Sequence, residues 1–269
     1  MLQKTFSYYS DDLEDVDLFV EAGKNHVACW CKKNADKQLK AFEFFLCDDY
    51  VETTFADLIK EMQMHSRLLS LQSNKTNFFW NTDEVLCLPP SQNDDALVNA
   101  HFELMFGNAE NTKIFSAAAN DCFIVWRLKH QQQDAAEAIF NRANFSHHYI
   151  ALFNQAKTDN TICYLFFYPN YFSLVVYNSR LLQLAQTRKY KTPEDVLYFI
   201  LNVFEQYAIP RDTDVVCAGF IDVRSKLYEL LYLYLENLKL MNVDEATTGN
   251  KAFGEHAQHY FLPYINYTV

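Results

Sequence analysis

The chain has 269 residues, of which 50% are hydrophobic, so it can bury the core of one large domain or of two domains of ordinary size. Its formal net charge of −11 excludes nonspecific binding to nucleic acids or anionic membranes, since both require a positively charged surface. Glycine and proline are scarce, with 5 and 6 residues, which argues against flexible linkers and disorder.

The cysteines and the N-terminal residues indicate a cytoplasmic protein. The seven cysteines are an odd number and lack the spacing of a disulfide framework, so we interpret them as small core residues in a reducing compartment. Residues 1–15 predict a partly ordered acidic leader without the apolar segment of a signal peptide. No apolar run reaches the roughly 18 residues that span a bilayer, so we expect no membrane insertion.

Three strands and a helix open the first half of the chain. Polar turns at 23–25 and 34–36 separate the strands, as in an antiparallel meander. Thr54 and Asp57 predict the start of a helix with apolar residues at helical spacing. In chain order, the predicted strands are 16–22, 26–32, 38–47, 75–80, 84–88 and 119–128. One predicted helix starts at Thr54, a second starts at Asp94 or Asp95 and ends at Gly107, and a third covers 132–141. The segment 145–155 is predicted as a strand followed by a helix.

The second half repeats this beginning more clearly. Thr192 is a predicted N-cap, Pro193 suits the first helical position, and Asp195 completes a capping box. The tail from residue 244 is polar and then aromatic, and we expect its aromatic end to pack back on the body. The predicted strands are 162–168, 171–177, 181–190 and 213–218, and the predicted helices are 192–207 and 224–240.

The order of elements indicates an internal duplication. The segment Leu18–Cys31 matches Tyr164–Tyr177 without a gap, which places Gly23-Lys24 on Pro169-Asn170. Each half has three antiparallel strands, a helix, a further strand and another helix, which is a layered α/β design. The strands show little alternation of polarity, as expected where helices cover both faces. The predicted organisation is an acidic leader at 1–15, a first half at 16–155, a second half at 156–243 and a C-terminal tail at 244–269.

Two such halves resemble the actin-like ATPase fold, in which a ribonuclease H-like unit occurs twice. More narrowly, the segments at 181–186 and 190–201 resemble the second half of a bacterial family of unknown function whose fold is actin-like. Val215–Gly219 and Leu227–Leu231 fit the same pattern. The resemblance covers residues 16–240 and is sharpest over 162–238. It implies a fold, two tandem ribonuclease H-like halves with mixed sheets, and leaves the function open.

The resemblance also implies where nucleotide would bind in an ATPase of this fold. One glycine-rich hairpin turn in each half brings backbone N–H groups to the phosphates, and an Asp in each turn helps to hold Mg²⁺. In the first turn, Gly23 keeps the permissive backbone, and Glu21 and Lys24 could serve a phosphate–metal site; the alternative is an ordinary hairpin glycine beside one polar strand residue. The second turn, Phe167–Asn170, has neither carboxylate nor glycine, and its proline has no N–H to donate.

At the adenosine position such ATPases have a pair of glycines after a late strand. Here the segment 218–222 keeps Gly219, followed by Phe220 and ending in Asp222. The candidate site residues are therefore a vestigial nucleotide cleft between the halves, with no catalytic residue and no resident metal. They are Glu21, Gly23, Lys24, Gly219 and Asp222.

Other clusters favour ordinary structural roles. The pairs His147-His148 and His256/His259 are the histidine clusters of the sequence, and only Glu255 joins the second pair at a ligand spacing, so we interpret them as solvated or partly buried histidines. The basic stretch 188–191 is interpreted as a solvated strand end. Three tyrosines in the predicted helix 224–240 are interpreted as core and interface residues: Tyr228, Tyr232 and Tyr234.

The sequence thus favours a noncatalytic cytoplasmic protein that acts through protein contacts or as an assembly scaffold. Aromatic residues, 16% of the chain, suit such an interface. No cofactor is predicted beyond residual binding of ATP and Mg²⁺, the partner is an unidentified protein, and a homodimer is left open. The alternative is a nucleotide-binding switch, or an ATP-dependent enzyme, that uses the degenerate cleft.

Overall fold

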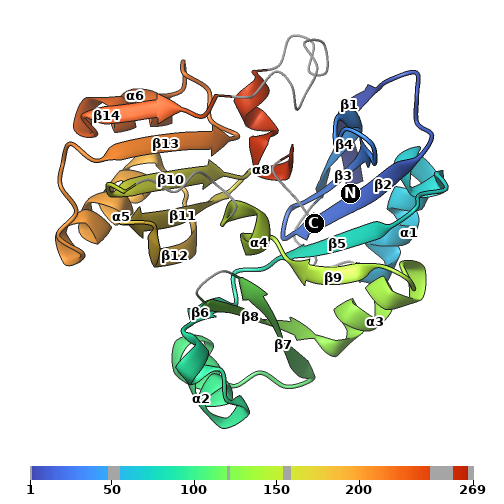
Figure 1. The fold of residues 1–269 in the computed structure, drawn as a ribbon, viewed down its shortest axis with the longest axis horizontal. Coiled ribbons are helices and arrows are strands. Elements are labelled where there is room, and N and C mark those ends of the chain that lie inside the picture. The colour runs from blue at the N-terminus through green and yellow to red at the C-terminus, as the bar shows by residue number, and fades with distance from the viewer. Residues whose placement is uncertain (1, 48–54, 120–121, 154–158, 243–256, 266–269) are drawn as a thin grey trace. The chain divides into compact units, whose positions relative to one another are not determined.

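The computed structural model describes residues 2–47, 55–119, 122–153, 159–242 and 257–265 (Figure 1). These residues form two units, one of residues up to Ile150 and one of the described residues from Ala151 onward.

The first unit is built on a mixed sheet of six strands, ordered β1-β4-β3-β2-β5-β9. Strands β1 to β4 pair antiparallel, whereas β5 pairs parallel with β2, and β9 parallel with β5. Strands β2 and β3 are buried almost throughout, which explains why their sequences do not alternate. The strands are β1 (Leu2–Tyr9), β2 (Val16–Gly23), β3 (His26–Lys33), β4 (Leu39–Cys47), β5 (Thr76–Asn81) and β9 (Asn144–His147), and the helices of this unit are α1 (Phe55–His65), the short η1 (Leu68–Ser70) and α3 (His130–Ile139). The short α4 (Tyr149–Leu152) contains the point in the chain at which the two units divide.

The N-terminal segment differs from the predicted leader. Residues 2–9 form β1, which pairs with β4 from Leu2 opposite Cys47 to Tyr9 opposite Ala41. Its residues alternate between half-buried and exposed over most of its length, as expected for a strand at the edge of a sheet. The acidic stretch after it, 11–15, is the connection to β2.

A small subdomain is inserted between β5 and α3. It is a three-stranded antiparallel sheet, ordered β6-β8-β7, with α2 packed on it around Val98, Phe102 and Val125. Asp94 caps α2, and Gly107 ends it with a φ of 76°, as predicted. Strand β7 was not predicted. The strand predicted over 119–128 corresponds to β8, which begins at Cys122. The elements are β6 (Val85–Leu88), η2 (Pro90–Gln92), α2 (Asp95–Phe106), β7 (Thr112–Ala119) and β8 (Cys122–Lys129).

The second unit is built on a five-stranded sheet, ordered β12-β11-β10-β13-β14. Strand β10 pairs antiparallel with β11 and parallel with β13, which in turn pairs parallel with β14. Helices α5 and α6 pack beside each other and share one apolar core with the sheet. The elements are β10 (Ile162–Phe167), β11 (Tyr171–Asn178), β12 (Leu181–Lys189), α5 (Pro193–Gln206), β13 (Asp214–Gly219), α6 (Lys226–Tyr234), β14 (Asn237–Leu240), η3 (Gln258–Tyr260) and α8 (Leu262–Ile265).

The start of α5 follows the predicted capping box. The Thr192 side chain accepts a hydrogen bond from the Asp195 N–H, and the Asp195 carboxylate accepts from the N–H of Thr192. The equivalent cap expected in the first half involves Thr54, which lies outside the described residues.

The helix predicted over 224–240 is wrong in its last part. Helix α6 ends at Tyr234, the backbone turns extended at Leu235, and residues 237–240 form β14. Leu235 and Leu238 are buried as expected, but Leu238 is buried from a strand, next to the exposed Lys239. Apolar residues continue at helical spacing past Tyr234, so the spacing alone does not show where α6 ends and β14 begins.

The duplication is visible in the sheets and corrects the predicted match by one residue. The order β4-β3-β2-β5-β9 repeats as β12-β11-β10-β13-β14, with the same parallel and antiparallel neighbours. The last pairs before the hairpin turns are Ala22 opposite Val27 and Phe167 opposite Phe172. Gly23 therefore matches Tyr168, not Pro169. A shift of one residue matters because it moves every side chain to the other face of a strand.

Candidate functional site

The first hairpin turn holds a buried carboxylate. Glu21, near the end of β2, is fully buried, and its Oε1 accepts a hydrogen bond from Asn81 Nδ2 at 2.8 Å. The Nε2 atom of His26, on β3, lies 3.1 Å from the same oxygen, and the His26 ring stacks on Phe44. The Glu21 carboxylate is thus held inside the unit by partners on β3 and β5, which compensates its burial.

Gly23 and Lys24 complete this turn. Gly23 is buried, but it is not one of the positive-φ glycines of the described chain, which are Gly107 and Gly219. The turn therefore does not depend on glycine for its backbone conformation. Lys24 is half-exposed.

Two buried histidines lie at the end of β9, next to the first turn. His147 and His148 are fully buried, so the prediction that they are solvated or partly buried is wrong. Their ring centroids are 4.5 Å apart, the His148 N–H donates to the Trp80 carbonyl, and the His147 Nδ1 atom accepts from the Tyr149 N–H. Burial lowers the pKa of His147 to about 3. Burial, and then the repulsion that arises when His147 is also protonated, lowers the pKa of His148 well below its ordinary value, so both rings are neutral at pH 7.

The carboxyl ends of β2, β5 and β9 therefore share a buried polar cluster. Parallel strands end at the same edge of a sheet, and Gly23 lies opposite Asn81 while Trp80 lies opposite His147. Sequence reasoning noted Glu21 but missed its partners. The available signal was a polar residue near the end of each of three otherwise apolar strands. The cluster consists of Glu21, His26, Asn81, His147 and His148.

The second hairpin turn is filled by aromatic rings. Tyr168 and Tyr171 stack with centroids 4.8 Å apart, and the ring of Tyr264 meets Tyr168 edge-on at 6.1 Å. All three are buried. The Tyr168 N–H donates to the Tyr171 carbonyl at 2.9 Å, and Pro169 has no N–H. The position that matches Gly23 is thus occupied by a bulky ring, and its backbone donor is used within the turn.

The backbone at the end of β13 explains why residue 219 is a glycine. Its φ is 85°, and a Cβ atom added there would lie 2.1 Å from the carbonyl oxygen of Phe167 on β10. The next N–H, that of Phe220, donates to this same oxygen at 2.8 Å. The glycine permits a close approach of two backbones.

Asp222 organises the loop after β13. Its carboxylate accepts hydrogen bonds from the Arg224 N–H at 2.7 Å and from the Tyr260 hydroxyl at 3.1 Å, and in that order these bonds lower its pKa. His259 Nε2 donates to the Ile221 carbonyl at 2.7 Å. Of the predicted site residues, Glu21, Gly23 and Lys24 thus lie together in the first unit, and Gly219 and Asp222 together in the second.

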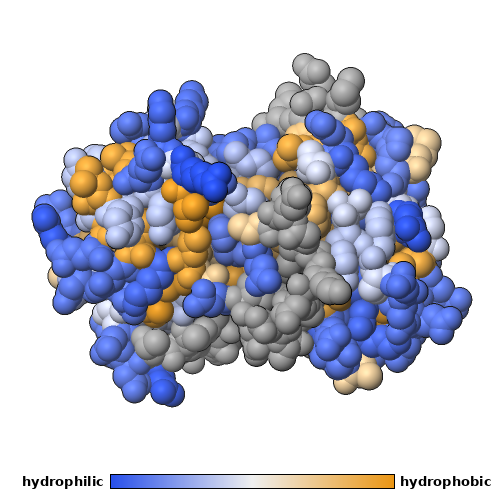
Figure 2. All heavy atoms as spheres, turned by 90° about the horizontal axis from the view of Figure 1, so that it is seen from above, coloured by the Kyte–Doolittle hydropathy of each residue, from blue (hydrophilic) through white to orange (hydrophobic). Residues whose placement is uncertain are grey.

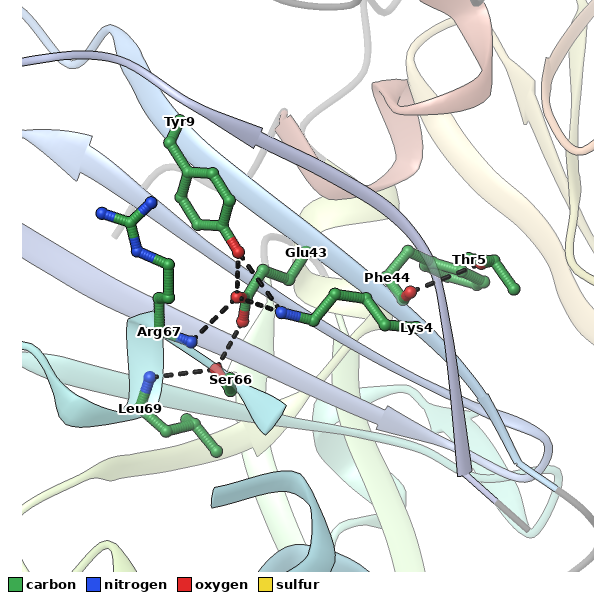
Figure 3. Close-up of polar contacts among 8 residues, drawn as sticks. All are labelled: Lys4, Thr5, Tyr9, Glu43, Phe44, Ser66, Arg67 and Leu69. Atoms are coloured by element: carbon green, nitrogen blue, oxygen red, sulfur yellow. Dashed lines mark hydrogen bonds and ion pairs between the residues drawn. The ribbon is translucent and has the colours of Figure 1, made fainter. Parts of the chain in front are cut away.

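A second buried carboxylate, Glu43, fastens β1 to the first unit (Figure 3). Lys4 Nζ lies 2.9 Å from the Glu43 carboxylate, the hydroxyls of Tyr9 and Ser66 donate to it, and the Arg67 N–H donates at 3.0 Å. Burial and the hydrogen bond to Glu43 raise the pKa of Tyr9, and the Arg67 guanidinium stacks on the Tyr9 ring. Glu43 thus has a structural set of partners that joins β1, β4 and the segment after α1.

The part of the chain that the structure describes contains neither a group of side chains suited to a metal ion nor a helix suited to a membrane. Within those residues, no group of three His, Cys, Asp or Glu side chains is placed to hold a metal ion. Likewise, none of their helices is long and apolar enough to cross a bilayer.

The repeated unit and its sheet order define the class of protein: it has the actin-like ATPase fold, a ribonuclease H-like unit present twice. Within that class, the chain belongs to the family described as "Protein of unknown function (DUF3822)", whose model matches residues 6–238. No protein of curated function matches the sequence.

Several solved structures share the fold. A protein of unknown function with an actin-like ATPase fold from Bacteroides thetaiotaomicron has a TM-score of 0.75 and 13% identity, over 87% of this chain and 94% of that chain. A chain of the PilM-PilN type IV pilus biogenesis complex has a TM-score of 0.66 and 12% identity, over 93% and 95%. The ethanolamine utilization protein EutJ from Carboxydothermus hydrogenoformans has a TM-score of 0.53 and 7% identity, over 96% and 91%. These identities establish a common fold and nothing more.

Proposed function

We propose that this chain is a noncatalytic cytoplasmic protein of the actin-like fold that acts as a scaffold through contacts with other proteins. The observation that carries the proposal is the filled second turn. An ATPase of this fold needs backbone N–H groups there that can approach a phosphate. In this chain Tyr168, Tyr171 and Tyr264 pack in and around the turn, and the Tyr168 N–H is already bonded.

The first turn supports the same proposal. A carboxylate that helps to hold Mg²⁺ through water must be open to the site. Glu21 is instead fully buried and bonded to Asn81 beside His26. The chemistry that remains in the turn is the half-exposed Lys24.

The surface of the second unit suits protein contacts. Large apolar side chains remain exposed on the neighbouring helices α5 and α6, with Tyr198 at 75%, Tyr232 at 67% and Leu233 at 76% exposure. Tyrosine is enriched at protein interfaces because it combines a large apolar area with a polar tip. Figure 2 shows one face of the molecule, on which hydrophobic side chains (orange) are exposed among hydrophilic ones (blue).

The comparison with a pilus protein is consistent with this role. A chain of the PilM-PilN complex has a similar fold, so the fold occurs in at least one assembly that contains a protein partner. The similarity is one of fold. It suggests a role in a protein assembly, and it does not identify a partner for this chain.

Thermal unfolding with and without Mg-ATP tests the noncatalytic part of the proposal. We expect no shift in Tm at millimolar ATP. A ligand present at 100 times its Kd adds about 2.7 kcal/mol to the free energy of unfolding, which is easily measured. A shift of that size that disappears in Lys24→Ala would replace the scaffold by the alternative, a nucleotide-binding switch or ATP-dependent enzyme.

The scaffold itself is tested by crosslinking in the native cell followed by purification of the full chain. We expect one recurrent protein partner, and reconstitution of that complex from two purified components. A chain that sediments as a monomer and crosslinks to no protein above background would refute the scaffold. A homodimer would appear in the same sedimentation experiment.

A further inference from the structure

The seven cysteines, all within the described residues, divide into two groups by their exposure. Five are buried, as predicted for small core residues, whereas Cys87 and Cys122 are half-buried. Both of these lie in the inserted subdomain, Cys87 on β6 and Cys122 at the start of β8 (Figure 1). The two cysteines that are open in part to solvent are therefore on neighbouring strands of one small sheet.

The register of the β6–β8 pair places these two side chains on one face of the sheet. Cys87 lies opposite Ile124, and Cys122 comes two residues before Ile124, so it points to the same face. Diagonal neighbours of this kind lie about 7–8 Å apart, with their Cβ atoms closer. The two thiols are near enough to share a hydrogen bond. The Cys122 thiol also donates to the Ala119 carbonyl at 3.4 Å, which holds it at this end of the sheet.

A diagonal position favours a disulfide that forms reversibly. The Cα atoms of a relaxed disulfide are usually about 4.4–6.8 Å apart, so bridging Cys87 and Cys122 moves the end of β6 toward β8. A strained or partly exposed disulfide is reduced more easily than a structural one. In the reducing compartment that the sequence predicts, such a bond is transient and serves redox sensing.

The environment of Cys87 gives the two thiols different roles. The hydrogen bond with Cys122, and then burial, raises the pKa of the Cys87 thiol well above its ordinary value. Cys87 is therefore protonated at pH 7. Because the thiolate is the nucleophile in sulfur chemistry, Cys122 is the residue that reacts first. The Cys87 sulfur lies beside it, in position for the second step.

We propose that Cys87 and Cys122 form a redox-sensitive dithiol, which a peroxide oxidises to a disulfide between β6 and β8 and a low-molecular-weight thiol reduces again. This site is independent of the proposed scaffold function. The Cys122 thiolate attacks one oxygen of hydrogen peroxide, the O–O bond breaks, and the departing hydroxide takes up the thiol proton as water, which leaves a sulfenic acid on Cys122. The Cys87 sulfur then attacks the Cys122 sulfur, the S–O bond breaks, and a second water leaves as the S–S bond forms.

The electrons balance in both directions. The two thiols together lose two electrons and two protons, and one peroxide becomes two waters. In the reverse direction, two molecules of the low-molecular-weight thiol give up two electrons and two protons and become its disulfide, which restores both cysteines.

Mass spectrometry after trypsin digestion tests the proposal on the full chain. Cleavage after Lys75, Lys113 and Arg127 places Cys87 in the peptide 76–113 and Cys122 in the peptide 114–127. The reduced chain is treated with hydrogen peroxide, the remaining thiols are blocked with N-ethylmaleimide, and the digest is measured without reductant. We expect the two peptides to be joined, and to be separate when glutathione is added to the oxidised chain before blocking.

Cys163 and Cys217 provide the matched control pair. They are diagonal neighbours on β10 and β13, because Cys163 lies opposite Val215, two residues before Cys217. Both are fully buried, at 0% exposure, so peroxide reaches neither in the folded chain. We expect at least about tenfold less joining of their peptides, 158–180 and 212–224.

Single variants separate the two steps of the oxidation. In Cys87→Ser the sulfenic acid of Cys122 should accumulate, and dimedone should label it. In Cys122→Ser, labelling at Cys87 should be about tenfold lower than this. Cys163→Ala should leave the joining of 76–113 to 114–127 unchanged. A circular dichroism spectrum and a Tm that match those of the native chain confirm that each variant is folded.

Several results would overturn the proposal. They are peptides 76–113 and 114–127 that stay separate after peroxide, equal joining of the Cys163 and Cys217 peptides, and conversion of Cys122 to a sulfinic acid that glutathione does not restore. A covalent dimer on a nonreducing gel that is lost in Cys122→Ser would assign Cys122 to a bond between two chains and refute the bridge to Cys87.

Discussion

Gly219 shows how one residue determines the spacing of two strands. Its positive φ and its contact with the Phe167 carbonyl both exclude a side chain. We expect Gly219→Ala to lower the free energy of unfolding by about 3–4 kcal/mol, because a backbone clash adds to the conformational strain. Urea denaturation measures this change.

Gly107 provides the matched control for Gly219. It also has a positive φ, of 76°, but a Cβ atom there would meet nothing within 4 Å. Gly107→Ala should therefore lower the free energy of unfolding by only about 1–2 kcal/mol, from backbone strain alone. Equal losses in the two variants would show that the close approach to Phe167 contributes nothing.

His147 and His148 make stability depend on pH in a defined direction. The unfolded chain protonates both near pH 6.5, whereas the folded chain does not protonate His147 until about pH 3, and His148 is shifted in the same direction. The free energy of unfolding should therefore fall as the pH drops below about 6.5, by about 1.4 kcal/mol per pH unit for each histidine. Above that pH the two residues contribute no slope.

Urea denaturation between pH 7 and 5 tests this prediction. His147→Asn should reduce the slope of the free energy of unfolding with pH, whatever it does to stability at pH 7. The burial argument fails if His147→Asn keeps the native slope.

At the scale of the element, β1 depends on the Glu43 carboxylate. Glu43 is fully buried, whereas the side chain of Lys4 is 25% exposed, so solvent weakens the pair only in part. We expect Glu43→Gln to lower the free energy of unfolding by about 2–4 kcal/mol, since it leaves buried donors without their charged acceptor. Hydrogen exchange should become faster in β1 first, because β1 is an edge strand.

An exposed ion pair serves as the control for Glu43. Asp159 and Arg180 lie 2.8 Å apart at 85% and 66% exposure. Asp159→Asn should change the free energy of unfolding by less than about 1 kcal/mol. Faster exchange spread evenly over β1 to β4 would contradict an anchoring role of Glu43 for β1.

At the scale of the whole molecule, the second unit includes residues from the C-terminal part of the chain. Phe261, Leu262 and Tyr264 are buried, and Tyr264 contacts the Tyr168 ring. We expect Tyr264→Ala to lower the free energy of unfolding by about 3 kcal/mol, and the Tm by about 10 °C, through the cavity it leaves. Calorimetry measures both.

Tyr232→Ala is the matched change on the surface. Tyr232 on α6 is 67% exposed, so its removal should shift the Tm by no more than about 2 °C. If Tyr264→Ala unfolds at the same temperature as Tyr232→Ala, the packing of 257–265 adds no stability to the unit.

The parts of the fold that depend on neighbours in the chain were predictable from the sequence. The hairpins of β2 to β4 and of β10 to β12, the Thr192 cap and the end of α2 at Gly107 follow from residues that are close in the chain. Strand β1 was missed because its partner β4 lies some forty residues away, and β14 because apolar spacing continued past the end of α6.

The sequence predicted some residues of the candidate site, but it did not predict how deeply they are buried or what surrounds them. The sequence named Glu21 and the aromatic second turn, but the burial of Glu21, His147 and His148 is produced by three strands that meet from distant positions. The match between the halves was displaced by one residue because no shared residue identity marks the turns. Pairing partners supply that register, and a sequence alone does not.

The subdomain inserted between β5 and α3 has a consequence for folding kinetics. It places the paired residues Asn77 and Asn144 67 positions apart, whereas the equivalent strands of the second unit pair at Asp214 and Asn237, 23 positions apart. Closing the longer loop costs about 1 kcal/mol more in chain entropy, and longer-range pairing slows folding. In pulse-labelled refolding we therefore expect β13 and β14 to gain protection before β5 and β9. The half synthesised first on the ribosome would then be the half that finishes its sheet last.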